Sequence, residues 1–184
     1  MFGEHQNRCR RLQKKMHFEY TKTTLEDLDT YTTCLNNPEF SEMLYRGEHV
    51  SLKKYLSDSP GDYKFVGHLV TPTGRKPIGF AHFYGRENNV YNYLGGIVPE
   101  YFNSGVGLYA SVGVLSTFFS IVPNASIITG IYKFNERSLK VDLALGFILE
   151  RETDEKWILS LNPINFQNAF TDKIRQRITF SYLG

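Results

Sequence analysis

Cysteine is scarce in this sequence of 184 residues, and its scarcity excludes several classes of protein. The chain has two cysteines, Cys9 and Cys34, with no CxxC pair between them. Small secreted scaffolds depend on several disulfides, and structural zinc sites need cysteine or histidine pairs at short spacing. We therefore expect reduced thiols, a cytoplasmic location and no bound metal.

A signal peptide and an apolar run long enough to span a membrane are also missing. The N-terminal residues lack the apolar core of a signal peptide. No residue between Tyr101 and Tyr132 is charged, but polar residues and Pro123 interrupt this segment. Because a membrane-spanning helix needs about 20 consecutive apolar residues, we expect a buried helix here and no membrane partner.

The chain has little excess of either charge, with a formal net charge of +2, and this small excess is unevenly placed. Five of the 21 Lys and Arg residues, but one of the 19 Asp and Glu residues, lie in residues 1–16, which leaves 16 basic and 18 acidic groups in the rest. A basic arm can bind nucleic acid or acidic lipid. We favour a flexible, solvated leader of residues 1–15, or translation that starts at Met16, and expect no nucleic-acid partner.

The remaining residues, 16–184, are expected to form one domain of alternating strands and helices. An apolar fraction of 41% indicates a packed core. Thr23 or Thr24 is the expected cap of the first helix, and Gly146 is expected to end the last one. The predicted strands are 18–23, 63–71, 77–84, 90–98, 125–133, 147–153 and 156–161, and the predicted helices are 25–35, 106–121 and 135–145, with a further helical region at 38–45 and 51–56. The segment 166–178 is amphipathic but has no predicted place.

Short turns join the strands 63–71, 77–84 and 90–98, as in an antiparallel meander. The strand 125–133 is continuously apolar, so it is expected to be buried and parallel to its neighbour. The helix 106–121 lies between the meander and this strand in the sequence and is apolar enough to need cover on more than one side.

The segment 93–119 is the centre of this pattern. A strand-like run, residues 94–98, leads through a Pro99-Glu100 turn into a loop with Gly105 and Gly107, and then into the apolar helix. Glycines let backbone N–H groups approach a ligand, and a helix start provides unpaired donors and a positive dipole end. The sequence therefore predicts a phosphate-binding site at residues 105–108.

Neither common nucleotide-binding motif fits this loop. Residues 105–110, GVGLYA, match the G-x-G-x-x-A fingerprint, but that fingerprint needs a βαβ unit and an acidic residue about 20 positions later. Here antiparallel strands precede the loop, and the next acidic residue is Glu136. A P-loop ends in Gly-Lys-Ser/Thr, whereas Gly107 is followed by Leu108.

The order of the predicted elements, together with two motifs, instead resembles the GCN5-related N-acetyltransferase (GNAT) superfamily. Residues 97–107, IVPEYFNSGVG, are similar to the family's acetyl-CoA loop, V-x-P-x-[YF]-[QR]-x-x-G-x-G/A. Residues 135–147, NERSLKVDLALGF, look like the N-x-x-S-x-x-V-x-x-x-L-G-F helix of the ribosomal-protein acetyltransferase branch. The resemblance covers residues 18–161.

The resemblance implies a mixed α/β fold of the α+β kind. The expected GNAT fold has a central, mostly antiparallel sheet of six or seven strands, about four flanking helices and a V-shaped splay between the fourth and fifth strands. It also implies acetyl-CoA as co-substrate, bound by the loop and by the later helix. The cofactor-binding residues carried over are Ile97, Val98, Phe102, Asn103, Ser104, Gly105, Val106, Gly107, Leu108, Asn135, Ser138 and Leu139.

Each group of these residues has an implied role. Backbone N–H groups of residues 103–108 would hold the pyrophosphate of CoA, Ile97 and Val98 would pair with its pantetheine arm, and Asn135 would contact that arm from the other side. Asn135 is also a plain helix cap. Phe102 stands where the family has Gln or Arg, so CoA affinity or loop closure is expected to be weaker.

The chain departs from the family in its acid and base. Many members have a Tyr where this chain has Asp142. A carboxylate there is expected to be ionised at neutral pH unless it is desolvated, and an ionised carboxylate is a poor proton donor. The candidates for the base are Tyr93 and Tyr91, on the strand before the loop, and His82 on the neighbouring strand. Tyrosines at such positions are more often packing or substrate-lining residues, because their pKa is near 10.

The expected function is transfer of an acetyl group from acetyl-CoA to a primary amine of a small molecule or peptide, by direct attack. The alternative is a CoA-binding regulatory or interaction module that is catalytically weak, which the missing base and Phe102 favour. The acceptor and the oligomeric state, including a homodimer, stay open.

Overall fold

The computed structural model describes residues 15–38, 61–169, 174 and 176–184. The predicted helical region at 39–45 and 51–56, and leader residues 1–14, lie outside these residues. The described strands are β1 (Met16–Lys22), β2 (Tyr63–Thr71), β3 (Gly74–Gly85), β4 (Val90–Ile97), β5 (Ser126–Tyr132), β6 (Ile148–Glu152), β7 (Lys156–Leu161) and β8 (Ile178–Leu183). The helices are α1 (Leu28–Leu35), α4 (Val106–Ile121), α5 (Glu136–Ala144) and α6 (Pro163–Ala169), with 3-10 turns at Leu25–Asp27, Glu87–Asn89 and Pro99–Tyr101.

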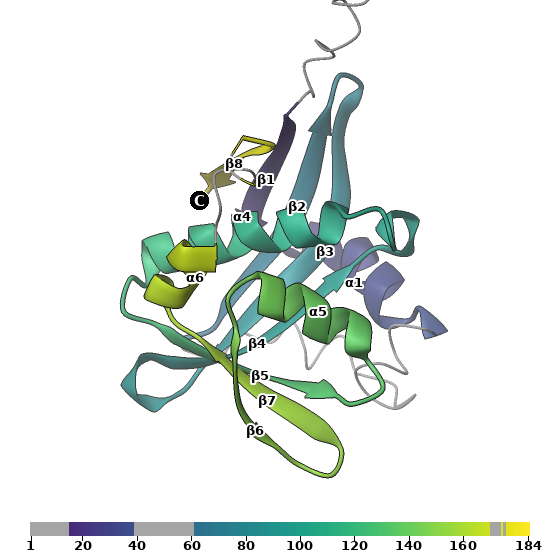
Figure 1. The fold of residues 1–184 in the computed structure, drawn as a ribbon. Coiled ribbons are helices and arrows are strands. Elements are labelled where there is room, and N and C mark those ends of the chain that lie inside the picture. The colour runs from purple at the N-terminus through teal and green to yellow at the C-terminus, as the bar shows by residue number, and fades with distance from the viewer. Residues whose placement is uncertain (1–14, 39–60, 170–173, 175) are drawn as a thin grey trace, which may run out of the picture.

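The described strands form one mixed sheet in the order β6-β7-β5-β4-β3-β2-β1-β8. Helices α4, α5 and α6 lie on one face of this sheet, and α1 lies on the other (Figure 1). The strands β1 to β4 pair antiparallel in chain order, as the meander predicts. The predicted mixed α/β class is confirmed.

The sheet has eight strands, so the expected six or seven is a correction. The extra strand is β8, which pairs parallel with β1 from Met16 and Ile178 onward. Of the unplaced segment 166–178, residues 166–169 belong to α6 and Ile178 begins β8. Only Ile178 of β8 is buried, so this edge strand has too weak an apolar pattern to be predicted from local sequence.

The first predicted helix is present, with a 3-10 turn before α1. Its cap is Thr24, whose backbone N–H donates to Asp27 Oδ2 at 2.8 Å, while the N–H of Glu26 donates to Thr24 Oγ1 at 3.3 Å. This reciprocal pair satisfies donors that a helix start leaves open.

The sheet splays between β4 and β5, as predicted. The two strands pair in parallel only over Val90 to Asn92 and Ser126 to Ile128. Beyond that point β4 stays paired with β3 as far as Ile97, and β5 stays paired with β7 as far as Tyr132. The neighbouring strands therefore pull β4 and β5 apart into a V.

Helix α4 packs on the sheet beside this V. Phe118 stacks on Phe83 with ring centroids 3.9 Å apart and planes 2° apart. Gly113 permits the close approach of Tyr20, since a Cβ there would collide with the Tyr20 side chain, and the Tyr20 hydroxyl donates to the carbonyl of Ala110 at 2.7 Å. None of the helices that the structure describes is long and apolar enough to cross a membrane.

Candidate active site

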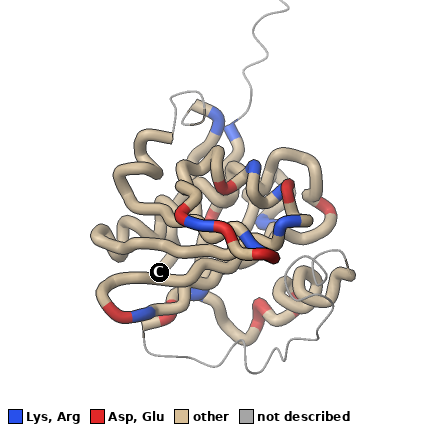
Figure 2. The backbone as a smooth tube through the Cα atoms, turned by 60° about the horizontal axis from the view of Figure 1, so that its bottom comes forward, with Lys and Arg blue, Asp and Glu red and all other residues tan. Residues whose placement is uncertain are grey.

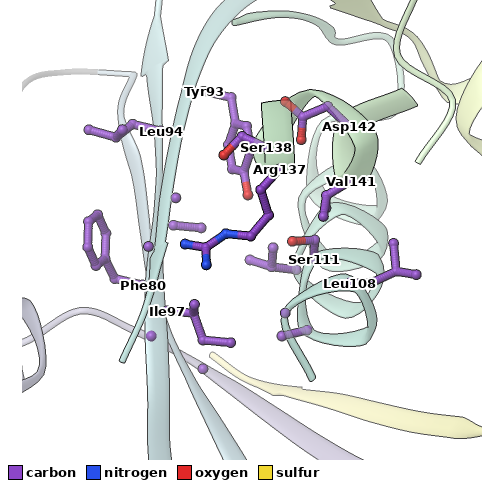
Figure 3. A pocket seen from close by; sticks show the side chains of 18 of the residues that line it. Phe80, Tyr93, Leu94, Ile97, Leu108, Ser111, Arg137, Ser138, Val141 and Asp142 are labelled. Atoms are coloured by element: carbon purple, nitrogen blue, oxygen red, sulfur yellow. The ribbon is translucent and has the colours of Figure 1, made fainter. Parts of the chain in front are cut away.

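A cavity of about 400 Å³ lies in the V between β4 and β5. Its walls come from the end of β4, the first turns of α4 and the first turns of α5 (Figure 3). The sequence predicts ligand contacts on these same three elements, although the first and last predicted residues, Ile97 and Leu139, are 42 positions apart in the chain. The V thus brings the glycine loop and the Asn135 helix to one space.

The glycine loop turns sharply into α4. Asn103 (φ 58°) and Gly105 (φ 80°) both have left-handed backbone conformations, which Asn and Gly tolerate best. The Ser104 hydroxyl donates to the carbonyl of Tyr101 at 2.6 Å and accepts from the N–H of Val106 at 3.1 Å. Gly105 is the N-cap of α4, and the Ser104 side chain before it satisfies the N–H of Val106.

The next two backbone donors face the cavity region. The N–H groups of Gly107 and Leu108 have no acceptor inside the helix, because the first four N–H groups of a helix have none. A Cβ at Gly105 would meet no heavy atom within 4 Å, and one at Gly107 would meet only Ile97 Cδ1 at 3.4 Å. An anion therefore has room to approach these donors closely.

The wall opposite α4 is the free edge of β4. Leu94, Gly95, Gly96 and Ile97 line the cavity beyond the last pair with β5. In the described part of the chain, no strand pairs with this edge, so its peptide groups are placed to pair with an extended ligand.

Helix α5 contributes the third wall. Asn135 is its N-cap, and its side-chain oxygen accepts from the N–H of Ser138 at 3.1 Å. Asn135 and Ser138 both line the cavity. Asn135 therefore caps the helix and also presents its buried amide to the site.

The structure gathers most of the predicted cofactor residues around the cavity, but not all of them. Val98 is buried in the apolar cluster on the α1 face, and Leu139 packs against the main core. Ser104 and Val106 are not among the residues that line the cavity. The predicted residues that line it are Ile97, Phe102, Asn103, Gly105, Gly107, Leu108, Asn135 and Ser138.

Of the three base candidates, the structure brings only Tyr93 to the cavity. Burial raises the pKa of Tyr93 well above its usual value, and the nearby Asp142 carboxyl adds to this shift. Tyr91 lies in the core, with its ring 5.0 Å from that of Phe118. Tyr93 therefore keeps its proton at neutral pH.

His82 is buried away from the cavity. Its Nε2 lies 3.0 Å from Oδ2 of Asp62. Burial lowers the pKa of His82 to about 4, and this effect outweighs the opposing effect of the Asp62 carboxylate. At neutral pH the imidazole is uncharged, so Nε2–H donates to Asp62.

Asp142 meets the exception to an ionised carboxylate, because it is desolvated. It lines the cavity, and burial raises its pKa to about 7. The position of a residue in the sequence does not reveal its burial, so the sequence alone left the protonation of Asp142 open. The location of Asp142 beside the site could have been predicted from the sequence, since Asn135, Ser138 and Asp142 lie at helical spacing on one face of α5.

Arg137 is a lining residue to which the sequence analysis assigned no role. Its side chain extends from α5 into the space between Ile97 and Ser111 (Figure 3). Among the described lining residues, Arg137 and Asp142 are the charged ones. Elsewhere in the described backbone, basic and acidic positions are interspersed (Figure 2). The same residues contain no cluster of three or more His, Cys, Asp or Glu side chains placed to hold a metal ion.

The buried Asp142 predicts a distinctive dependence of stability on pH. An acid whose pKa rises from 3.8 to about 7 on folding holds a proton that the unfolded chain releases. The fold therefore loses stability as the pH rises through this interval. Asp142→Asn is expected to gain about 3 kcal/mol in free energy of unfolding relative to wild type between about pH 5 and pH 8.

Urea unfolding across this pH range measures the difference. Asp154→Asn, an exposed change in the β6–β7 turn, is the matched control and is expected to follow wild type. A difference between Asp142→Asn and wild type that stays constant with pH would contradict the assignment.

The fold with its V-shaped sheet and glycine loop is that of the GCN5-related N-acetyltransferases. The sequence itself matches no family model and no curated protein. Spermidine N-acetyltransferase from Vibrio cholerae, crystallised with CoA and spermine, superposes with a TM-score of 0.69 at 15% identity, over 82% of this chain and 98% of that one. The aminoglycoside acetyltransferase AAC(6')-Ib, in complex with coenzyme A, gives 0.68 at 15% identity, over 84% and 99%. A domain from Methanocaldococcus jannaschii gives 0.68 at 16% identity, over 80% and 99%.

Proposed function

We propose that this protein transfers an acetyl group from acetyl-CoA to a primary amine. The observation that carries the proposal is the cavity in the V, where the free edge of β4 meets the open N–H groups at the start of α4. An extended arm that ends in a pyrophosphate matches this combination of a strand edge and an anion site. The acetyltransferases that share the fold support the same conclusion.

Acetyl-CoA fits the residues that line the cavity. Its pyrophosphate would lie on the backbone donors of Gly107 and Leu108, in the space that the missing side chains at Gly105 and Gly107 leave open. Its pantetheine arm would pair with β4 up to Ile97 and form a hydrogen bond with the Asn135 amide of α5. The acetyl group would then reach the inner part of the V, beside Tyr93 and Asp142.

The chemistry requires a neutral amine and a proton for the departing thiol. The amine nitrogen attacks the thioester carbonyl, the carbon–sulfur bond breaks, and sulfur takes a proton. We assign this proton to Asp142, because burial keeps its carboxyl protonated to about pH 7. The amine's own proton then leaves through water and restores Asp142. Tyr93, with its raised pKa, serves as a hydrogen-bond donor in the cavity.

The acceptor is proposed as a small-molecule or peptide amine. The compounds in the names of two neighbours, spermidine and aminoglycosides, both carry several amino groups. Because the α5 motif resembles the ribosomal-protein acetyltransferase branch, we propose a peptide N-terminus as one specific acceptor.

We propose a cytoplasmic location, because the low cysteine content is typical of proteins in a reducing compartment.

A binding module without turnover is the second candidate. The observation in its favour is that Asp142 is the only described lining residue with a carboxylate or an imidazole. Such a module would bind CoA and release no thiol.

A screen for thiol release separates the two functions. The purified protein, saturated with acetyl-CoA, is incubated with polyamines, aminosugars, aminoglycosides and peptides, and free CoA thiol is measured. We expect release above the hydrolysis background with at least one class of amine. Binding of acetyl-CoA without release from any class would overturn the enzyme proposal and favour the module.

A further inference from the structure

The position of Phe102 in the glycine loop raises the question of what replaces the cation or amide of the resembling motif. The main-chain donors of the loop are intact, but the Phe102 side chain offers the phosphates nothing polar. The structure brings a cation to this position from another element. The guanidinium carbon of Arg137 lies 4.9 Å from the centroid of the Phe102 ring, over its face.

We propose that Arg137 binds the pyrophosphate of CoA, and that the Phe102 ring holds its guanidinium in position. This inference rests on the proposed function, since it names a residue in the same cofactor site. The polar group that the motif places at residue 102 of the loop is supplied here by residue 137, which lies on a different element.

The contacts of Arg137 place it at the phosphate end of the cavity. Its Nη1 lies 3.4 Å from Oδ1 of Asn103, one of the loop residues that precede the α4 donors. Arg137 also lines the cavity itself. Its guanidinium is therefore close to the place where the backbone argument puts the pyrophosphate.

Two acidic residues lie near Arg137 in the sequence of α5. Glu136, the adjacent acid, is paired with Lys140 at 3.5 Å. Asp142 lies five residues further along α5, about 7.5 Å along the helix axis. Arg137 is the only cation among the described lining residues, and a planar guanidinium matches phosphate oxygens in a two-point contact.

The Phe102 ring positions the Arg137 guanidinium for ligand binding. An arginine side chain is long and loses rotamer freedom when it binds. Stacking on the face of Phe102 restricts the guanidinium before the ligand arrives. The ring thus contributes to anion binding through Arg137, although it contacts no phosphate itself.

Calorimetric titration with CoA and with dephospho-CoA, which lacks the 3′-phosphate, tests the assignment. Arg137→Ala is expected to weaken both ligands by the same factor, at least about tenfold. Arg137→Lys should show a smaller loss of affinity than Arg137→Ala, because lysine keeps the positive charge but cannot make the two-point contact of a guanidinium. Lys140→Ala, an exposed change on the same helix, is the matched control and should bind as wild type does.

The salt dependence separates a phosphate contact from a merely structural role. Between about 50 mM and about 500 mM KCl, the Kd of wild type should rise more steeply than that of Arg137→Ala, because a screened ion pair has been removed. A structural role would leave the two slopes equal. Phe102→Leu should weaken binding in the wild-type background and have little further effect in Arg137→Ala.

Four outcomes would overturn the inference. Unchanged affinity in Arg137→Ala would remove Arg137 from the site, and a loss confined to CoA would assign it to the 3′-phosphate. Equal salt slopes would make it a structural tie between α5 and the loop. Failure of wild type to bind CoA would overturn the proposed function as well, so the two failures are distinguishable.

Discussion

Gly107→Trp is expected to lower the affinity for acetyl-CoA by at least about 100-fold, or about 2.7 kcal/mol. A Cβ at residue 107 lies 3.4 Å from Ile97 Cδ1, so an indole there would extend into the space between α4 and β4. It would fill the place of the pyrophosphate and cover the donors of Gly107 and Leu108. Calorimetric titration with acetyl-CoA measures the loss.

The fold should survive this substitution, since residue 107 is in the first turn of α4 and faces the cavity. Ser120→Trp adds the same bulk at an exposed position near the other end of this helix, and should bind acetyl-CoA as wild type does. Both variants should keep the melting temperature within about 4 °C of wild type. A folded Gly107→Trp protein with wild-type affinity would refute the placement of the pyrophosphate.

Asp142→Asn is expected to lower kcat by about 100-fold at neutral pH, within the range of general acid catalysis. Asparagine keeps the shape of the side chain but has no acidic proton for the thiol. Wild type should also lose activity as the pH rises above about 7, because Asp142 then ionises. This falling limb should be absent from the variant, and stopped-flow thiol release at several pH values measures it.

The controls for Asp142→Asn separate chemistry from binding. The affinity for acetyl-CoA should be unchanged, since Asp142 is not proposed to contact the pyrophosphate. Tyr93→Phe should keep the falling limb, because the pKa of Tyr93 is raised far above this pH range. Wild-type rates and an unchanged pH profile in Asp142→Asn would contradict the role of Asp142.

The elements of the site were predictable because their signals are local. Thr24, Gly105 and Gly146 mark helix ends with residues suited to caps and left-handed turns. The strands 63–98 are separated by short turns, so antiparallel pairing follows from the chain itself. For the same reason, the loop at 97–107 and the helix from Asn135 were placed on the correct elements.

The parts that were missed depend on distant residues. Strand β8 was not predicted because its pairing partner, β1, lies about 160 residues earlier in the chain, and local pattern does not report such pairing. The pKa of Asp142 depends on burial under elements that the helix pattern does not specify. Arg137 reaches Phe102 only because the V sets α5 opposite the glycine loop, so no spacing within the motif predicted their contact.

The most direct test of the central claim is a calorimetric titration of the wild-type protein with acetyl-CoA. The account predicts saturable binding of one acetyl-CoA per chain, with a Kd of about 1–100 µM. Absence of binding at an acetyl-CoA concentration of about 1 mM would contradict both the enzyme and the binding module, since both require the cofactor in the V between β4 and β5.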